Sequence, residues 1–273
     1  DESTRPNRAW KLNRSPSQFV VGSSLSTLGI ELMSGEVLYQ TDLPIRSEIA
    51  ETHAAAAVHW ASPGTWWSSL ERIAIVTEVR KAWDADPLPP WTPPSTVEGL
   101  VPDDHVLPAA VIDVIWRLTN HVTTLTKNWY ESYVPDQLSP QHYVELVGVI
   151  AQVTLTDRFA DALRLKRLAL PEPRDGSPTQ VVPDDAEVTT HWVPTAPIVD
   201  GSWNPATPSD VPNVRKALSL VASERMMQWV LIDAHYVQGG ALADDFGQDH
   251  WSLTRSQIEL LGARTSTVND CFY

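Results

Sequence analysis

Apolar residues recur along most of this chain at intervals of three or four positions, the spacing that places side chains on one face of an α-helix. Only two short stretches, 18–21 and 36–39, have the composition of strands. We therefore predict an all-α fold. The expected helical segments are 43–60, 68–83, 107–133, 140–165, 214–236 and 254–268.

Local signals mark where some of these helices begin. Ser68 and Glu71 have the spacing of a capping box, in which each side chain bonds the backbone N–H of the other residue. Ser139 fits an N-cap, and Pro140 fits the first helical position after it. For two helices the spacing also predicts the buried face. These faces hold Leu70, Ile73, Ala74 and Thr77 in one helix and Ile112, Ile115, Leu118 and Val122 in the other.

Proline-rich stretches divide the chain. Residues 84–102 and 171–212 are rich in proline, which cannot continue a helix because it lacks a backbone N–H donor. The second stretch holds nine prolines, and we interpret it as the connection between two halves. The expected organisation is an irregular N-terminal arm at 1–44, a first helical unit at 45–170, a Pro-rich connection at 171–212 and a second helical unit at 213–273.

A short internal repeat supports two related units. Glu145-Leu-Val-Gly and Glu259-Leu-Leu-Gly are 114 residues apart, and each follows a predicted helix start. Asp157 comes twelve residues after Glu145, at the position where the later copy has Cys271. We interpret this as a duplication in which the first unit has lost its thiols; the alternative is chance similarity between amphipathic helices. In the first unit, Asp157 and Arg158 would form an ion pair in place of the lost redox site.

The last predicted helix carries the residues with the clearest chemistry. Thr254 and Gln257 fit a capping box at its start. Glu259 lies early in the helix, and Cys271, the only cysteine, follows twelve residues later. Twelve residues span about 18 Å along a helix, so the two groups can meet only through a bend, a second helix or a water relay. The positions expected on the apolar face are Ile258, Leu261, Thr265 and Val268.

The Glu-Leu pair at Glu259, the small-residue helix and the closing Asn-Asp-Cys-Phe-Tyr resemble the core of the alkylhydroperoxidase-D-like (AhpD-like) family, also called carboxymuconolactone decarboxylase-like. In that family a glutamate also precedes the first cysteine by twelve residues, as in this sequence. Members usually continue Cys-x-x-Cys and place a histidine shortly after, whereas this sequence stops at Tyr273, after the first cysteine. The resemblance implies a tandem of two AhpD-like helical units, the first degenerate and without cysteines, the second incomplete at its C-terminus.

The resemblance also implies a function. It is a thiol-dependent, peroxidase-like oxidoreductase that reduces a hydroperoxide or related small substrate, with Cys271 and Glu259 as catalytic residues. Glu259 would be the proton relay, and Cys271 matches the resolving cysteine of the family pair. The implied partners are a small-molecule substrate, a thiol reductant and further copies of the chain in a homo-oligomer, with no cofactor.

Three other interpretations stay open. The fold could serve a lyase or isomerase that acts on a small lactone or carboxylate through acid–base residues without a thiol. It could also belong to a non-catalytic helical subunit whose role is assembly. A purely structural interpretation makes Glu259 a first-turn glutamate favoured by the helix dipole and Cys271 a small buried side chain.

Composition narrows the remaining classes of function. The formal charge of −14 argues against nucleic-acid binding, which needs clustered Lys and Arg. No apolar run approaches the roughly 20 residues of a membrane span. A single cysteine excludes an internal disulfide framework. We expect a cytoplasmic location. The first residue is Asp1 rather than methionine, so a removed targeting segment, which would imply another location, stays open as the alternative.

The histidines give weaker signals. His53 and His59 are six residues apart, which does not place them on one helix face, so we predict no metal site. For His235 and Tyr236 we expect core packing, with a pocket against the last helix as the alternative. His121 lies near a predicted helix junction, and we expect its ring to be bonded within the fold.

Overall fold

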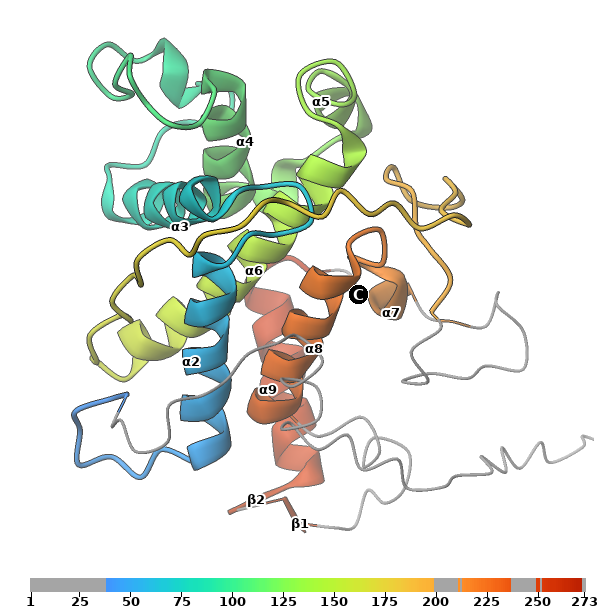
Figure 1. The fold of residues 1–273 in the computed structure, drawn as a ribbon. Helices are drawn as coiled ribbons and strands as arrows, with labels where there is room; N and C mark the ends of the chain where they lie inside the picture. The colour runs from blue at the N-terminus through green and yellow to red at the C-terminus, as the bar shows by residue number, and fades with distance from the viewer. Residues whose placement is uncertain (1–37, 199–210, 212, 237–248, 251, 272–273) are drawn as a thin grey trace, which may run out of the picture.

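The computed structural model describes residues 38–198, 211, 213–236, 249–250 and 252–271 (Figure 1). Within these residues the chain is mostly helical, which confirms the predicted all-α class. The α-helices are α2 (Ser47–Ala61), α3 (Ser69–Asp84), α4 (Ala109–Asn120), α5 (Lys127–Glu131), α6 (Pro140–Ala162), α7 (Asn213–Lys216), α8 (Ala222–His235) and α9 (Arg255–Val268). The smaller elements are two 3-10 turns, Pro94–Thr96 and Val122–Thr124, and the antiparallel strands β1 (Asp249–His250) and β2 (Leu253–Thr254).

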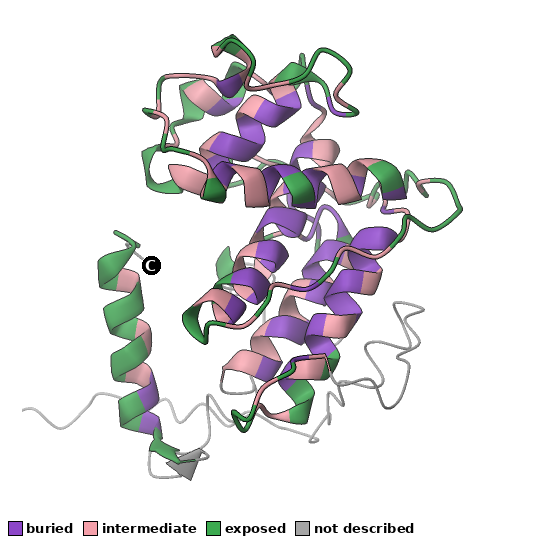
Figure 2. Ribbon diagram, turned by 90° about the vertical axis from the view of Figure 1, so that its left-hand side faces the viewer, coloured by how far each residue is buried: buried purple, intermediate pink, exposed green. Residues whose placement is uncertain are grey.

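Helix α6 is the centre of the fold. It has 23 residues, and it packs against α2, α3, α4 and α8 (Figure 1). Its buried side chains point in several directions, among them Val144, Leu146 and Val149. A helix that is apolar around most of its circumference is typical of a core position. The surrounding helices therefore each bury one face against α6, and the buried residues of Figure 2 gather there.

The predicted helix starts of α3 and α6 are confirmed. Ser68 and Glu71 form both hydrogen bonds of the capping box at α3. The hydroxyl of Ser139 accepts a hydrogen bond from the backbone N–H of His142, and Pro140 is the first residue of α6. These contacts join residues only three positions apart, so they depend on local sequence alone.

Other boundaries shift by a few residues. The helix predicted from residue 43 begins at Ser47, because Arg46 is extended. The segment predicted at 107–133 contains the two helices α4 and α5, one of the arrangements expected from the sequence. The predicted segment 214–236 is split near residue 222, as expected, into α7 and α8.

The buried face of α3 differs from the prediction. Ile75, Val76 and Val79 are completely buried, whereas Leu70 is 54% exposed. The prediction was wrong for Leu70 and Thr77, which are exposed, whereas Ile73 and Ala74 are partly buried against the core. Arg72 is itself completely buried and shares the inward face with the three completely buried apolar residues, at spacings of three, four and seven.

The face predicted for α4 is mostly confirmed. Ile112, Ile115 and Leu118 are buried in the core. Val122 is 57% exposed, because α4 ends at Asn120 and the helical period does not continue through the turn that follows.

Of the predicted Pro-rich connection, the structure describes residues 171–198 and 211. The connection contains no helix over residues 171–198, and its only pairing in that range is an isolated bridge between Glu187 and Thr195. It runs along the end of α2, where the N–H of Arg174 donates to the carbonyl of Ala61 at 2.7 Å. The rest of the connection lies outside the described residues, as do most of the predicted arm and both predicted strands apart from residues 38 and 39. The division into two units stays a prediction.

Helix α9 lies at the edge of the fold, and most of its surface is exposed (Figure 2). Its capping box between Thr254 and Gln257 is formed as predicted. Of the predicted apolar face only Ile258 is buried, while Leu261 and Val268 are 57% and 63% exposed. Among the described helices, none combines the length and the apolar character needed to cross a bilayer.

Candidate functional site

The structure does not bring the two predicted catalytic residues together. Glu259 lies in the second turn of α9, since the helix begins at Arg255, and Cys271 lies three positions after its last residue, Val268. Glu259 and Val268 are nine helical residues apart, or about 14 Å along the axis, and Cys271 follows beyond that end of the helix. The thiol of Cys271 is free and exposed rather than buried. Its backbone N–H donates to the carbonyl of Ser266 at 2.9 Å, which closes the end of the helix.

Glu259 belongs to a small polar cluster at the start of α9. Its carboxylate accepts a hydrogen bond from Nε of Arg255 at 2.6 Å. The Arg255 side chain is buried, whereas that of Glu259 is 40% exposed. The hydroxyl of Tyr236, which follows α8, also bonds this carboxylate, and burial together with that bond raises the pKa of Tyr236. The cluster thus holds the start of α9 against the end of α8.

A second set of charged residues is buried between α2, α3, α6 and α8. Arg72 of α3 contacts Glu145 of α6 at 2.5 Å and Glu224 of α8 at 2.8 Å. Glu224 also bonds Nε2 of His59 at 2.8 Å and the side-chain amide of Gln152 at 2.7 Å. Four helices are therefore joined through one guanidinium and two carboxylates.

Burial and the shared guanidinium shift the pKa values of Glu145 and Glu224 in opposite directions. Burial raises the pKa of Glu145 to about 7, against the opposing effect of Arg72. Burial also disfavours the charged form of Glu224, but Arg72 and His59 outweigh it and lower the pKa of Glu224 to about 2. Perturbed groups of this kind occur in active sites and in structural ion-pair networks. Both carboxylates and the guanidinium are completely buried, so we interpret this network as one that stabilises the packing of the four helices.

Sequence reasoning missed this network, because its members come from helices far apart in the chain. Two glycines, Gly64 and Gly148, could have indicated from the sequence that another element approaches closely at this network. A Cβ atom at Gly148, inside α6, would lie 2.7 Å from Cβ of Glu224. A Cβ atom at Gly64 would overlap the carboxylate of Glu145. A glycine within a helix often marks such a close approach between elements.

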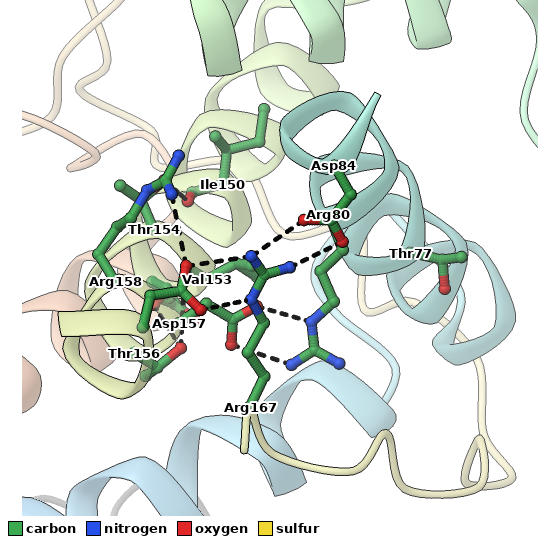
Figure 3. A network of polar contacts seen from close by, with 12 residues as sticks. Thr77, Arg80, Asp84, Ile150, Val153, Thr154, Thr156, Asp157, Arg158 and Arg167 are labelled. Atoms are coloured by element: carbon green, nitrogen blue, oxygen red, sulfur yellow. Dashed lines mark hydrogen bonds and ion pairs between the residues drawn. The ribbon is translucent and has the colours of Figure 1, made fainter. Parts of the chain in front are cut away.

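The position that corresponds to Cys271 in the first unit is part of an ion-pair network (Figure 3). Asp157 is buried and accepts hydrogen bonds from Nε and Nη2 of Arg80 at 2.6 and 3.0 Å. The predicted pair between Asp157 and Arg158 is therefore wrong. Arg158 pairs with Asp161 at 3.4 Å, because adjacent residues of a helix point about 100° apart.

Three histidines singled out in the sequence, His53, His121 and His235, are bonded to neighbouring groups of the fold. Nδ1 of His53 lies 2.6 Å from the hydroxyl of Tyr39, and Nε2 of His53 lies 2.7 Å from Nε2 of His235. Burial lowers the pKa of His53 to about 3 and that of His235 to about 4, so both rings are neutral near pH 7. His121, as expected, bonds within the fold, to the carbonyl of Leu88 at 2.7 Å. Over the residues described, no group of three or more His, Cys, Asp or Glu is arranged to hold a metal ion.

Comparison with known proteins leaves the family open. No family model, curated protein or solved structure matches the chain. The AhpD-like resemblance therefore stays a prediction, and the function has to be argued from the chain's own residues.

Proposed function

We propose that the protein is a thiol-dependent, peroxidase-like oxidoreductase with Cys271 as its redox residue. The observation that carries this proposal is the free, solvent-exposed thiol directly after α9. Reactive cysteines have to be accessible, since only the thiolate form attacks and the oxidant must reach it. An exposed thiol can react with a small hydroperoxide and then with a small thiol, whereas a buried thiol would be inaccessible to both molecules.

The proposed reaction uses one cysteine and an external thiol. The thiolate of Cys271 attacks a peroxide oxygen, the O–O bond breaks, and the alcohol leaves with a proton while the sulfur becomes a sulfenic acid. One reductant thiol condenses with the sulfenic acid, which releases water and forms a mixed disulfide. A second reductant thiol then attacks this disulfide and restores Cys271. Overall, one hydroperoxide and two thiols give one alcohol, one water and one disulfide.

In this proposal Glu259 is the proton relay for the thiol. Because nine residues of α9, or about 14 Å, lie between Glu259 and the end of the helix that precedes Cys271, the relay requires groups from two copies of the chain or a bend in α9. A homo-oligomer is therefore part of the proposal. Its support is the exposed apolar surface of α9, where Leu260, Leu261 and Val268 are 70%, 57% and 63% exposed. Exposed apolar groups on one element are typical of contact surfaces.

Consumption of a hydroperoxide tests the proposal. Cumene hydroperoxide would be followed with dithiothreitol as reductant, for the wild-type protein, Cys271→Ser and Glu259→Gln. We expect turnover by the wild type, none by Cys271→Ser and a lower rate for Glu259→Gln. Glu131→Gln is the matched control, since Lys127 and Glu131 form an exposed pair at the same helical spacing as Arg255 and Glu259. Equal rates for the wild type and Cys271→Ser would exclude Cys271 as the redox residue.

A non-catalytic role in assembly is the second candidate, and the same exposed face of α9 favours it. Light scattering should give the mass of an oligomer for the wild type and a smaller mass for Leu261→Glu. An oligomer without peroxidase activity would favour assembly over catalysis. The lyase or isomerase alternative has less support, because the perturbed carboxylates of Glu145 and Glu224 are enclosed by helices.

A further inference from the structure

A cavity of about 310 Å³ opens between α4, α5 and the Pro-rich segment 88–94. This lies within the range of roughly 300–1,000 Å³ that is usual for small-molecule sites. The helices and the segment that form it belong to the first half of the chain. None of them takes part in the Glu259 cluster or the buried Arg72 network. The cavity is therefore a separate feature of the fold.

The cation in this cavity is Arg117, on the last turn of α4. Its Nη2 donates to the carbonyl of Thr124 at 3.0 Å, and its guanidinium lies 5.9 Å from the ring centroid of Trp129. Its Nε–H is buried and has no hydrogen-bond partner among the described residues. No carboxylate of the described residues forms an ion pair with Arg117 either, so its positive charge is available to an anion.

Aromatic side chains form much of the cavity wall. Trp129 and Tyr133 lie with ring centroids 5.4 Å apart at an angle of 52°. Trp91, from the Pro-rich segment, is 79% exposed, although a large aromatic side chain gains from burial. A planar ring inserted between these side chains would cover Trp91 and stack against the others. Arginine beside such a wall is suited to a carboxylate attached to the ring.

The acidic side chain and the imidazole of the wall, Asp113 and His121, are engaged within the fold. Both carboxylate oxygens of Asp113 accept hydrogen bonds from Ser95, from its N–H at 2.9 Å and its hydroxyl at 2.7 Å. Nε2 of His121 lies 2.7 Å from the carbonyl of Leu88. Arg117 is therefore the charged group left to fix a ligand, and the negative charge of Asp113 disfavours a second negative charge on that ligand.

We propose that this cavity binds a small aromatic monocarboxylate, with the ring against Trp91, Trp129 and Tyr133 and the carboxylate on Arg117. Binding here requires no reaction at Cys271, so it is independent of the proposed oxidoreductase activity.

Isothermal titration calorimetry with 2-naphthoate tests this site, with the neutral 2-naphthamide as the matched ligand. We expect the wild type to bind 2-naphthoate at least about tenfold more tightly than the amide, as for a hydrogen bond to a charged group. Arg117→Gln should remove this preference. Arg158→Gln is the matched control and should keep the preference for 2-naphthoate. The guanidinium of Arg158 also lies over a tryptophan ring, 4.1 Å from the ring centroid of Trp83, but outside the cavity.

Trp91→Ala provides a second variant, since so exposed a side chain can be removed without unfolding the protein. We expect it to weaken binding of both ligands by a similar factor. Thermal unfolding would check each variant, and if Arg117→Gln is unfolded, Trp91→Ala and the amide comparison decide the question. The proposal is overturned if the wild type binds neither ligand or binds both equally. It is also overturned if folded Arg117→Gln, or Trp91→Ala, binds 2-naphthoate as the wild type does.

Discussion

Replacing Arg72 by methionine would remove the guanidinium that lies between two buried carboxylates, at 2.5 Å from Glu145 and 2.8 Å from Glu224. Methionine fills a comparable volume, so the change is mainly one of charge. Breaking a buried ion pair by removing one partner costs about 3–5 kcal/mol, because the remaining charge is left uncompensated. A typical domain has only about 5–15 kcal/mol of stability, so Arg72→Met should lose a large part of it.

Urea unfolding followed by tryptophan fluorescence would measure this loss. The double variant Arg72→Met with Glu145→Gln should recover about 1–3 kcal/mol, since it removes one of the two unpaired charges. Lys127→Met is the matched control. It makes the same type of change at the exposed pair with Glu131, which should cost only about 0.5 kcal/mol or less.

The pH dependence gives an independent check. Without the guanidinium, burial should raise the pKa of Glu145 above its wild-type value of about 7 and that of Glu224 above the unfolded value. A raised pKa in the folded state means that stability is gained when the group is protonated, and is lost as the pH rises through that pKa. The deficit of Arg72→Met relative to the wild type should therefore shrink as the pH falls from 8 to 5. A loss below about 1 kcal/mol, or a deficit independent of pH, would refute the electrostatic account of this network.

Three further outcomes are expected from urea unfolding. Gly148→Ala should lose about 1–3 kcal/mol, because the new Cβ would lie 2.7 Å from Cβ of Glu224 in a packed core, and an unchanged midpoint would contradict that contact. Ser139→Ala should lose about 1 kcal/mol with the N-cap of α6, and no loss would mean that the cap is dispensable. His53 and His235 have lowered pKa values of about 3 and 4, so their contribution to stability is present above pH 6.5 and is lost as the pH falls towards these values. His53→Asn should reduce this acid sensitivity between pH 6.5 and 4, and an unchanged pH profile would exclude His53 as a source of it.

Parts of the candidate site were visible in the sequence. The spacing placed Glu259 and Cys271 twelve residues apart on one helix, and the helix formed with the predicted capping box. The same spacing indicated that the two groups could not meet along a straight helix, and α9 runs on from Glu259 to Val268 before the turn that holds Cys271. The exposure of Cys271 was not visible, because it depends on how little of α9 packs against the rest of the chain.

The two glutamates of the internal repeat show most directly that local sequence does not predict burial. Glu145 and Glu259 open the same four-residue pattern, yet one is completely buried against Arg72 while the side chain of the other is 40% exposed. Their local sequences are nearly alike, so the difference comes from the helices packed around them. The cavity beside Arg117 likewise exists only because α4, α5 and the Pro-rich segment meet in the folded protein.

Local sequence was enough to predict the helical class, the starts of α3, α6 and α9 and the proline-rich breaks, because helical period, capping and proline geometry act between residues a few positions apart. The packing of the helices sets which charges are buried and which residues share a site. Arg72 and Glu224 are 152 residues apart, and their pairing depends on the packing of α3 and α8 against α6. Such contacts follow from the fit of whole helix faces, which local spacing does not encode.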